Sequence, residues 1–170
     1  APQFGGTSAI SGGAVWIHDS DQARKMAVGG SPQAIETYLR TIIGEPHYRQ
    51  DLVDAFIASG REALAFLEKE GAVKYSLRPL SPDYYPDEPG AVDVGRALEV
   101  VEFDGRELGA HFRDLRSPPP GMLLFGGMMV NRVDIQHFLD MRRSPRSFAH
   151  CGRLLLRYGR DRLRYPRGTR

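Results

Sequence analysis

Residues 5–17 read GGTSAISGGAVWI and form the most distinctive stretch of the chain. Its first nine residues include four glycines, and most of the others are small or bear a hydroxyl group. Such a loop lets the backbone approach a large anionic ligand closely and offer it N–H donors. The apolar run at residues 14–17 follows at once and predicts a short strand or a buried extension. A glycine-rich terminus is also typical of a flexible tail, so its meaning depends on the rest of the chain.

Length and composition indicate an ordinary soluble globular protein. The chain has 170 residues, of which 41% are hydrophobic and 26% are charged, with a net charge of +2. This length suffices for one domain with a core. No apolar run approaches the roughly 20 residues of a membrane span, and no signal peptide is evident. The single cysteine, Cys151, cannot form an internal disulfide. It fits a reducing compartment, so we expect the protein in the cytoplasm.

Helical periodicity dominates residues 31–71. Ser31 is a candidate N-cap, and Gly44 ends the apolar repeat that follows it, which predicts a first helix. A second repeat begins near residue 48, and Gly60 is expected to break it. A capping-box pattern directly after that break predicts a third helix, ended by Gly71. The prediction is therefore three short helices packed in series.

The rest of the chain mixes strands, loops and helices. Alternation predicts strands over 72–77 and 97–103, separated by a loop at 78–96 that contains four prolines and two glycines. Long loops of this kind are often functional. Further on we expect a short helix over 104–112, a turn and strand over 117–127, and helices over 131–143 and 144–165. Because strands and helices do not alternate regularly, the predicted class is α+β, with short helices packed beside a small sheet.

Charge and metal-ligand patterns give less. Four arginines near the C-terminus fall on one helical stripe: Arg153, Arg157, Arg160 and Arg164. Such a stripe can bind phosphate or nucleic acid, but the nearly balanced charge favours a solvated or salt-bridged face and no nucleic-acid partner. The histidines show no metal-binding spacing, so we expect no metal site. Acid and base chemistry is expected from the loop SPDYYPDEPG, residues 81–90.

Three segments together support a resemblance to a known family. GGTSAISGGAVWI, then PDYYPDEPG and GRALEVVEFDGRELG, resemble the flavoproteins that group fumarate reductase with 3-ketosteroid dehydrogenase, with features of the ketosteroid branch. The resemblance implies FAD as cofactor and Tyr84 and Tyr85 as catalytic residues on the substrate side. It implies that the flavin contacts Gly5, Gly6, Thr7, Ser8, Ser11, Gly12 and Gly13. The alternative for the tyrosines is an aromatic pair that only packs its loop onto the domain.

The resemblance also implies that these residues are a middle piece of a flavoenzyme. Members of the family begin with a βαβ unit carrying G-x-G-x-x-G, whose helix N-terminus receives the FAD pyrophosphate, and no such pattern occurs here. Residues 1–29 would be the tail of the FAD-binding domain and residues 30–170 a cap or substrate domain, incomplete at its C-terminus. The isolated chain is then expected to be inactive and not to hold FAD tightly.

The reaction implied for the whole enzyme is dehydrogenation, or the reverse reduction, of a carbon–carbon bond next to a carbonyl or carboxylate. The expected partners are a small-molecule substrate, the remainder of the polypeptide and a second copy in a homodimer. The alternative is a non-enzymatic interaction domain, in which the proline-rich loop or the arginine stripe binds a protein or an anionic surface.

Overall fold

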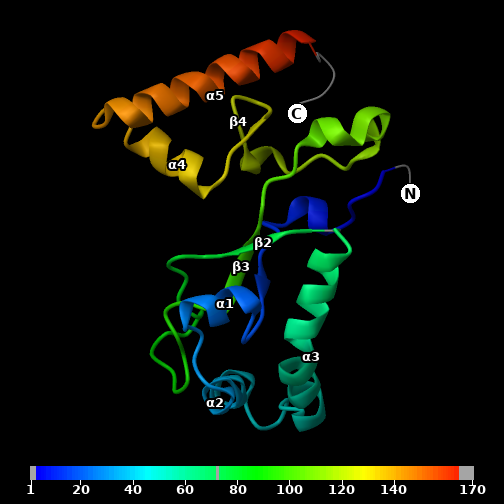
Figure 1. The fold of residues 1–170 in the computed structure, drawn as a ribbon, viewed down its shortest axis with the longest axis vertical. Helices are drawn as coiled ribbons and strands as arrows, with labels where there is room; N and C mark the ends of the chain where they lie inside the picture. The colour runs from blue at the N-terminus through cyan, green and yellow to red at the C-terminus, as the bar shows by residue number, and fades with distance from the viewer. Residues whose placement is uncertain (1–2, 72, 165–170) are drawn as a thin grey trace. The chain divides into compact units, whose positions relative to one another are not determined.

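The computed structural model describes residues 3–71 and 73–164, without the side chain of Met122. The chain divides into two compact units. One is Gly12–Glu102, and the other combines the residues up to Ser11 with those from Phe103 onward. Both contain helices and short antiparallel strands, which confirms the α+β class (Figure 1).

A small antiparallel sheet lies at the centre of unit Gly12–Glu102. Its strands are β1 (Val15–Trp16), β2 (Tyr75–Leu77) and β3 (Ala97–Val100), in the order β1-β3-β2. Leu98 on the middle strand pairs with Val15 on one side and Leu77 on the other, and it is fully buried. The strands predicted around residues 72–77 and 97–103 are therefore present but shorter, and Ala72 lies outside the described residues.

The helices of this unit are α1 (Asp21–Met26), α2 (Pro32–Ile43) and α3 (Gln50–Lys69). The predicted boundaries of α2 are confirmed. The Ser31 hydroxyl accepts a hydrogen bond from the Ala34 amide at 3.1 Å, and Gly44 follows the last turn with a φ of 77°. Ile35 and Tyr38 on the inner face of α2 are buried.

The predicted break at Gly60 is wrong, because α3 runs through it as one helix. An added Cβ at Gly60 would lie 3.5 Å from Ile17, an ordinary van der Waals distance, so α3 packs beside this residue without requiring glycine. A mid-helix glycine costs only about 1 kcal/mol relative to alanine. Burial of Val53 and Leu64 on either side of Gly60 outweighs that cost. The helix ends before Gly71, whose φ is 71°.

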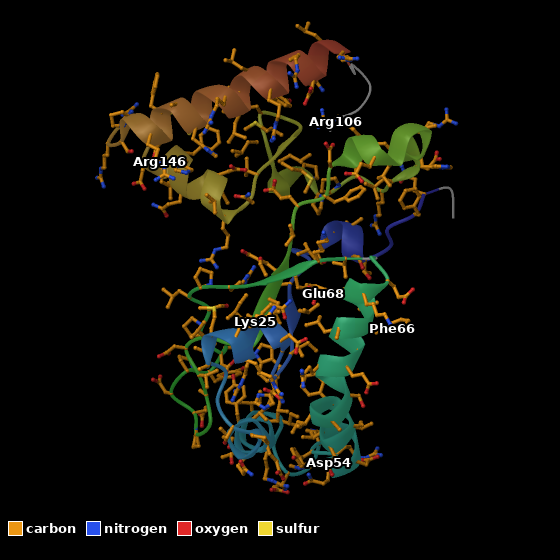
Figure 2. All side chains as sticks on the ribbon, in the orientation of Figure 1. Lys25, Asp54, Phe66, Glu68, Arg106 and Arg146 are labelled. Carbon is orange, nitrogen blue, oxygen red and sulfur yellow. The ribbon has the colours of Figure 1, made fainter. Side chains whose placement is uncertain are left out.

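One carboxylate near the end of α3 ties three elements together. Glu68 accepts hydrogen bonds from the Gln22 side chain on α1 at 2.9 Å and from the Tyr75 amide of β2 at 2.9 Å (Figure 2). Phe66, two residues earlier, is exposed on the other side of the helix. These contacts fix α3 against the sheet that carries Trp16.

The other unit is built from short elements and two packed helices. It contains η1 (Ser8–Ile10), η2 (Gly105–Asp114), η3 (Pro120–Met122), the hairpin β4 (Leu123–Leu124) and β5 (Met128–Met129), α4 (Arg132–Leu139) and α5 (Pro145–Arg164). The helix predicted over 104–112 is a 3₁₀ helix with non-helical geometry at Gly109. Tyr165, the last residue of the predicted final helix, lies outside the described residues.

Helices α4 and α5 pack against each other (Figure 1). Polar side chains join them. Asp134 forms a capping box with Asn131, and its Oδ1 lies 2.7 Å from His150 Nε2 on α5. His137 Nδ1 lies 3.0 Å from the Ser147 hydroxyl. Two of the five histidines thus join helices. In the part of the chain that the structure describes, no group of three or more His, Cys, Asp or Glu residues could hold a metal ion.

The arginine stripe lies on the exposed side of α5. Arg153, Arg157 and Arg160 are all exposed, and Arg160 lies 3.6 Å from the carboxylate of Asp161. This position agrees with a solvated, partly salt-bridged face. Among the helices over the described ranges, 3–71 and 73–164, none is long and apolar enough to cross a membrane.

Candidate active site

The proline-rich loop presents both predicted tyrosines to solvent. Residues 78–96, all of which the structure describes, contain no helix or strand. The side chain of Tyr84 is 95% exposed and that of Tyr85 is 59% exposed. The ring of Tyr84 therefore makes little contact with this unit. Both hydroxyl groups are available to a ligand.

The loop is closed at its base by paired backbone and side-chain hydrogen bonds. The Asp83 amide donates to the Val92 carbonyl at 3.0 Å, and the Val92 amide donates to the Asp83 carboxylate at 3.0 Å. One step further out, the Ser81 amide donates to the Asp93 carbonyl at 3.2 Å. The two tyrosines thus lie in a closed segment whose ends are fixed to each other.

A buried carboxylate connects this loop to strand β1. Asp83 is 5% exposed, and its two oxygens accept hydrogen bonds from three groups. Besides the Val92 amide, these are the indole N–H of Trp16 at 2.8 Å and the guanidinium of Arg96 at 2.6 Å. A buried carboxylate requires such partners, because an isolated one would be strongly destabilising.

Arg96 completes this network from the base of β3. It is 1% exposed and donates to the carbonyls of Gly29 at 3.2 Å and Gly90 at 2.9 Å, in addition to Asp83. Its guanidinium also lies 5.6 Å from the Trp16 ring centre. Burial lowers the pKa of Arg96, and the neighbouring Asp83 charge opposes that shift. An arginine stays charged in such a site, so the pair is an ion pair.

Helix α2 packs against the loop and supports it. A Cβ on Gly90, whose φ is 83°, would lie 2.1 Å from the Ala34 carbonyl oxygen, so only glycine permits this approach. The hydroxyl of Tyr38 accepts a hydrogen bond from the Tyr85 amide at 3.2 Å. The backbone at Tyr85 and, after the tyrosine pair, at Gly90 is therefore held against one helix.

The first part of the glycine-rich motif, up to Ser11, lies in the unit that contains α4 and α5. The Gly5 carbonyl accepts from the Ala9 amide at 3.0 Å, and the Gly6 carbonyl accepts from Arg116 at 3.1 Å. The side chains of Thr7, Ser8 and Ser11 are exposed. This segment is thus a short 3₁₀ turn with exposed side chains, in which the Ser11 hydroxyl donates to the Ser8 carbonyl at 3.1 Å.

The last two glycines of the motif belong to unit Gly12–Glu102 and lead into β1. Gly13 has a φ of 68°, and an added Cβ would lie 3.0 Å from Val100. At Gly12 an added Cβ would meet no described atom within 4 Å, and its φ is not in the left-handed region. Neither packing nor φ within the described chain demands glycine there. Open backbone at this point fits a flat ligand such as a flavin, which would approach the chain closely.

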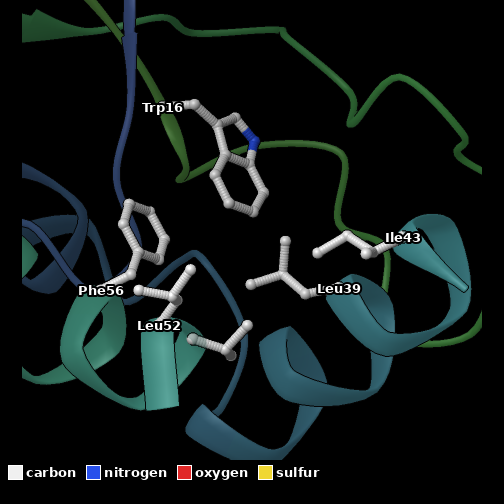
Figure 3. A pocket seen from close by; sticks show the side chains of 6 residues that line it. Trp16, Leu39, Ile43, Leu52 and Phe56 are labelled. Carbon is white, nitrogen blue, oxygen red and sulfur yellow. The ribbon is translucent and has the colours of Figure 1, made fainter. Parts of the chain in front are cut away.

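An apolar cavity lies beside Trp16, which is one of its lining residues. Its volume is about 300 Å³, and its lining side chains come from β1, α2 and α3 and point toward one another (Figure 3). They are Trp16, Leu39, Ile43, Leu52, Val53 and Phe56. The Trp16 and Phe56 rings stack with centres 6.0 Å apart. Trp16 therefore presents its N–H to Asp83 and its ring face to an apolar space.

Sequence reasoning named the tyrosines but missed the residues that hold them. Asp83 lies between prolines, Arg96 precedes a strand and Trp16 lies in a different segment, so no local spacing links them. The one available signal was a pair of oppositely charged residues within a loop rich in proline and glycine. Their pairing follows from the closure of that loop, in which Asp83 and Val92 exchange hydrogen bonds.

Comparison with known proteins decides the family. The model of the family described as "FAD binding domain" matches residues 1–162. The chain belongs to the FAD binding domain family. FAD is the cofactor of this family, so the flavoprotein resemblance is confirmed.

Relatives of this FAD binding domain chain are named dehydrogenases. It is 35% identical over 146 residues to the 3-oxosteroid 1-dehydrogenase of Mycobacterium tuberculosis (strain ATCC 25618 / H37Rv). The aligned region covers 86% of this chain and 25% of that relative. It is 34% identical over 164 residues to the 4-oxocyclohex-2-ene-1-carboxylate 5-dehydrogenase of Sinomonas cyclohexanicum, covering 96% of this chain and 27% of that one. The chain thus spans about a quarter of the length of these relatives.

A solved structure resembles this FAD binding domain chain as well. The crystal structure of 3-ketosteroid delta1-dehydrogenase from Sterolibacterium denitrificans, in complex with 1,4-androstadiene-3,17-dione, superimposes with a TM-score of 0.77 at 30% sequence identity. The match covers 95% of this chain and 28% of the other.

Proposed function

We propose that this chain is part of an FAD-dependent dehydrogenase that introduces a double bond next to a ring carbonyl. The observation that carries the proposal is the hydrogen bond from Trp16 to Asp83. Trp16 follows the glycine-rich motif by three residues, and Asp83 directly precedes the two exposed tyrosines. This contact holds the strand that follows the glycine-rich motif to the segment proposed to meet the substrate.

The chemistry assigned to the chain is proton handling and orientation. FAD, when bound, supplies the acceptor for the hydride that leaves one carbon of the substrate. The hydrogen on the adjacent carbon leaves as a proton. A deprotonated Tyr84 or Tyr85 would take that proton, or the hydroxyl of either residue would donate a hydrogen bond to the substrate carbonyl. Their exposure, on a loop with a fixed base, supports this role.

The proposed cofactor contacts are those of the glycine-rich motif: Gly5, Gly6, Thr7, Ser8, Ser11, Gly12 and Gly13. Open backbone at Gly12 and exposed side chains at Thr7 and Ser8 support this assignment. We also propose the division into residues 1–29 from an FAD-binding domain and 30–170 from a cap or substrate domain. A small-molecule substrate, contacts with the rest of the polypeptide, a homodimer and a cytoplasmic location belong to the same proposal.

The proposed substrate class is a cyclic ketone. The names of three relatives share an oxo-substituted ring, either a 3-oxosteroid or a 4-oxocyclohexane or 4-oxocyclohexene carboxylate. Dehydrogenation beside a carbonyl is favoured because the carbonyl acidifies the neighbouring C–H bond. Reduction of a fumarate-like acid is the reverse type of reaction and is the outcome that would redirect the proposal.

The test is a turnover assay on the flavoprotein that contains this chain. Purified enzyme is given a 3-oxosteroid, 4-oxocyclohexanecarboxylate or fumarate, with an artificial electron acceptor or donor dye. We expect turnover with a cyclic ketone, and a decrease of about 10²-fold or more in Tyr84→Phe or Tyr85→Phe. Because Tyr84 is exposed, Tyr84→Ala should change the free energy of unfolding by no more than about 0.5 kcal/mol. Full turnover in both phenylalanine variants would contradict the proposed tyrosine chemistry.

A further inference from the structure

We infer that Asp83 and Arg96 are positioning residues, which hold the Tyr84–Tyr85 segment at a fixed place for the reaction. This inference rests on the proposed function of the two tyrosines. It goes beyond that proposal because it assigns a functional role to a buried ion pair that itself touches neither substrate nor cofactor.

The first argument is the number of segments that meet at this pair. Arg96 donates to Asp83 at the start of the loop, to the Gly90 carbonyl after the tyrosines and to the Gly29 carbonyl before α2. Asp83 also accepts a hydrogen bond from the indole N–H of Trp16 on β1. The two side chains thus join both ends of the tyrosine segment to the sheet and to the start of α2.

The second argument is the contrast in burial. Asp83 and Tyr84 are neighbours in sequence, yet Asp83 is almost completely buried and Tyr84 almost completely exposed. An exposed side chain on a loop is normally mobile, because few contacts oppose its motion. Here the adjacent residue accepts three hydrogen bonds from groups on the same compact unit. The backbone under Tyr84 is therefore fixed although its ring is free.

The third argument is that burying an ion pair is an energetically costly way to pack a loop. A buried ion pair is often no more stabilising than apolar residues of the same volume. The guanidinium, however, offers several donors in a rigid plane, and here it reaches three acceptors at once. Lysine cannot reproduce this, because its ammonium is a single point of charge on a flexible stem. The arrangement favours geometric definition, which matters because a displacement of about 1 Å can reduce turnover about 10²-fold.

The test is a mutant cycle on the flavoprotein that contains the chain, with kcat expressed per bound FAD so that unfolded enzyme does not count. Arg96→Lys is made in the native background and in the Tyr84→Phe/Tyr85→Phe background. We expect a decrease in kcat of about tenfold or more in the native background, with KM within about threefold. In the double-phenylalanine background the same change should lower kcat by less than about twofold, because no hydroxyl is left to position. An equal decrease in both backgrounds would overturn the inference.

Leu64→Ala is the matched control for loss of stability. Leu64 is buried on α3 and takes no part in the network, so this variant should lower the melting temperature while leaving kcat per bound FAD within about twofold. If the double-phenylalanine enzyme keeps full turnover, the proposed chemistry fails by itself. If that enzyme is slow and Arg96→Lys is as fast as the native protein, only the positioning role fails.

A second measurement does not depend on turnover. Amide hydrogen exchange reports on the Tyr85 N–H, bonded to Tyr38, and the Val92 N–H, bonded to Asp83. In Arg96→Lys, or in Asp83→Asn should the lysine variant not fold, these two amides should exchange at least tenfold faster. The Leu98 amide in β3 should change by less than about threefold. Unchanged exchange at Tyr85 and Val92 would overturn the inference even if turnover fell.

Discussion

Replacing Gly60 with alanine should stabilise the protein, because this glycine lies within one continuous helix. Its φ is helical, and an added Cβ would contact Ile17 at 3.5 Å and 3.6 Å, which are ordinary van der Waals distances. Alanine is favoured over glycine inside a helix by about 0.5–1 kcal/mol. Partial burial of the new methyl group against Ile17 adds a few tenths of a kcal/mol, from about 0.8 kcal/mol for a fully buried methylene. The expected gain in the free energy of unfolding is about 1 kcal/mol.

The matched control is the same substitution at Gly71, just beyond the end of α3. Gly71 has a φ of 71°, and an added Cβ would meet no described atom within 4 Å. The methyl group would not clash there, but an alanine in the left-handed region costs about 1–2 kcal/mol. The backbone conformation is helical at Gly60 and left-handed at Gly71, so the two substitutions should have effects of opposite sign. Urea unfolding of the 170-residue chain, followed by circular dichroism, measures both.

The sign at Gly60 decides between two descriptions of this segment. If residues 50–69 formed two helices separated at Gly60, that glycine would serve as a C-cap in the left-handed region. Alanine would then destabilise the protein at Gly60 just as at Gly71. A loss of stability in Gly60→Ala would therefore refute the continuous helix and the packing argument built on Ile17.

Two further predictions concern protonation and cofactor binding. His18 is 4% exposed, burial and the Arg96 charge lower its pKa below 6.5, and its ring nitrogens have no hydrogen-bond partner among the described residues. As the pH falls, the unfolded chain therefore binds the extra proton before the folded chain does. The free energy of unfolding should decrease as the pH drops from 6.5 to the lowered pKa, by at most about 1.4 kcal/mol per pH unit. His18→Leu should flatten that part of the pH profile, and an unchanged profile would count against a buried neutral His18. The 170-residue chain should not bind FAD with a sub-micromolar Kd, because no G-x-G-x-x-G loop for the pyrophosphate occurs in it. Fluorescence quenching on titration of FAD measures the Kd, and a sub-micromolar value would contradict this expectation.

Local signals in the sequence were sufficient where one segment determines its own conformation. Ser31 and Gly44 set the ends of α2, and Asn131 caps α4, because a capping side chain bonds to backbone only three residues away. The proline-rich loop was predictable for the same reason, since its prolines and glycines exclude a regular helix or strand over that range. The family resemblance also lies in contiguous motifs, and the match over residues 1–162 confirmed it.

Tertiary structure decided what depends on contacts between distant segments. Gly60 is a helix breaker by local preference, yet Val53, Leu64 and Ile17 bury enough apolar surface to keep α3 continuous. Trp16 and Asp83 are 67 residues apart, so their hydrogen bond follows from the chain path that brings the loop beside β1. The α+β class and the family follow from the sequence alone, which also predicted the tyrosine pair. The burial of Asp83 and Arg96 next to that pair could be seen only in the tertiary structure. Removing two charges from water is costly, and the cost is offset only when several segments of the chain supply hydrogen bonds together.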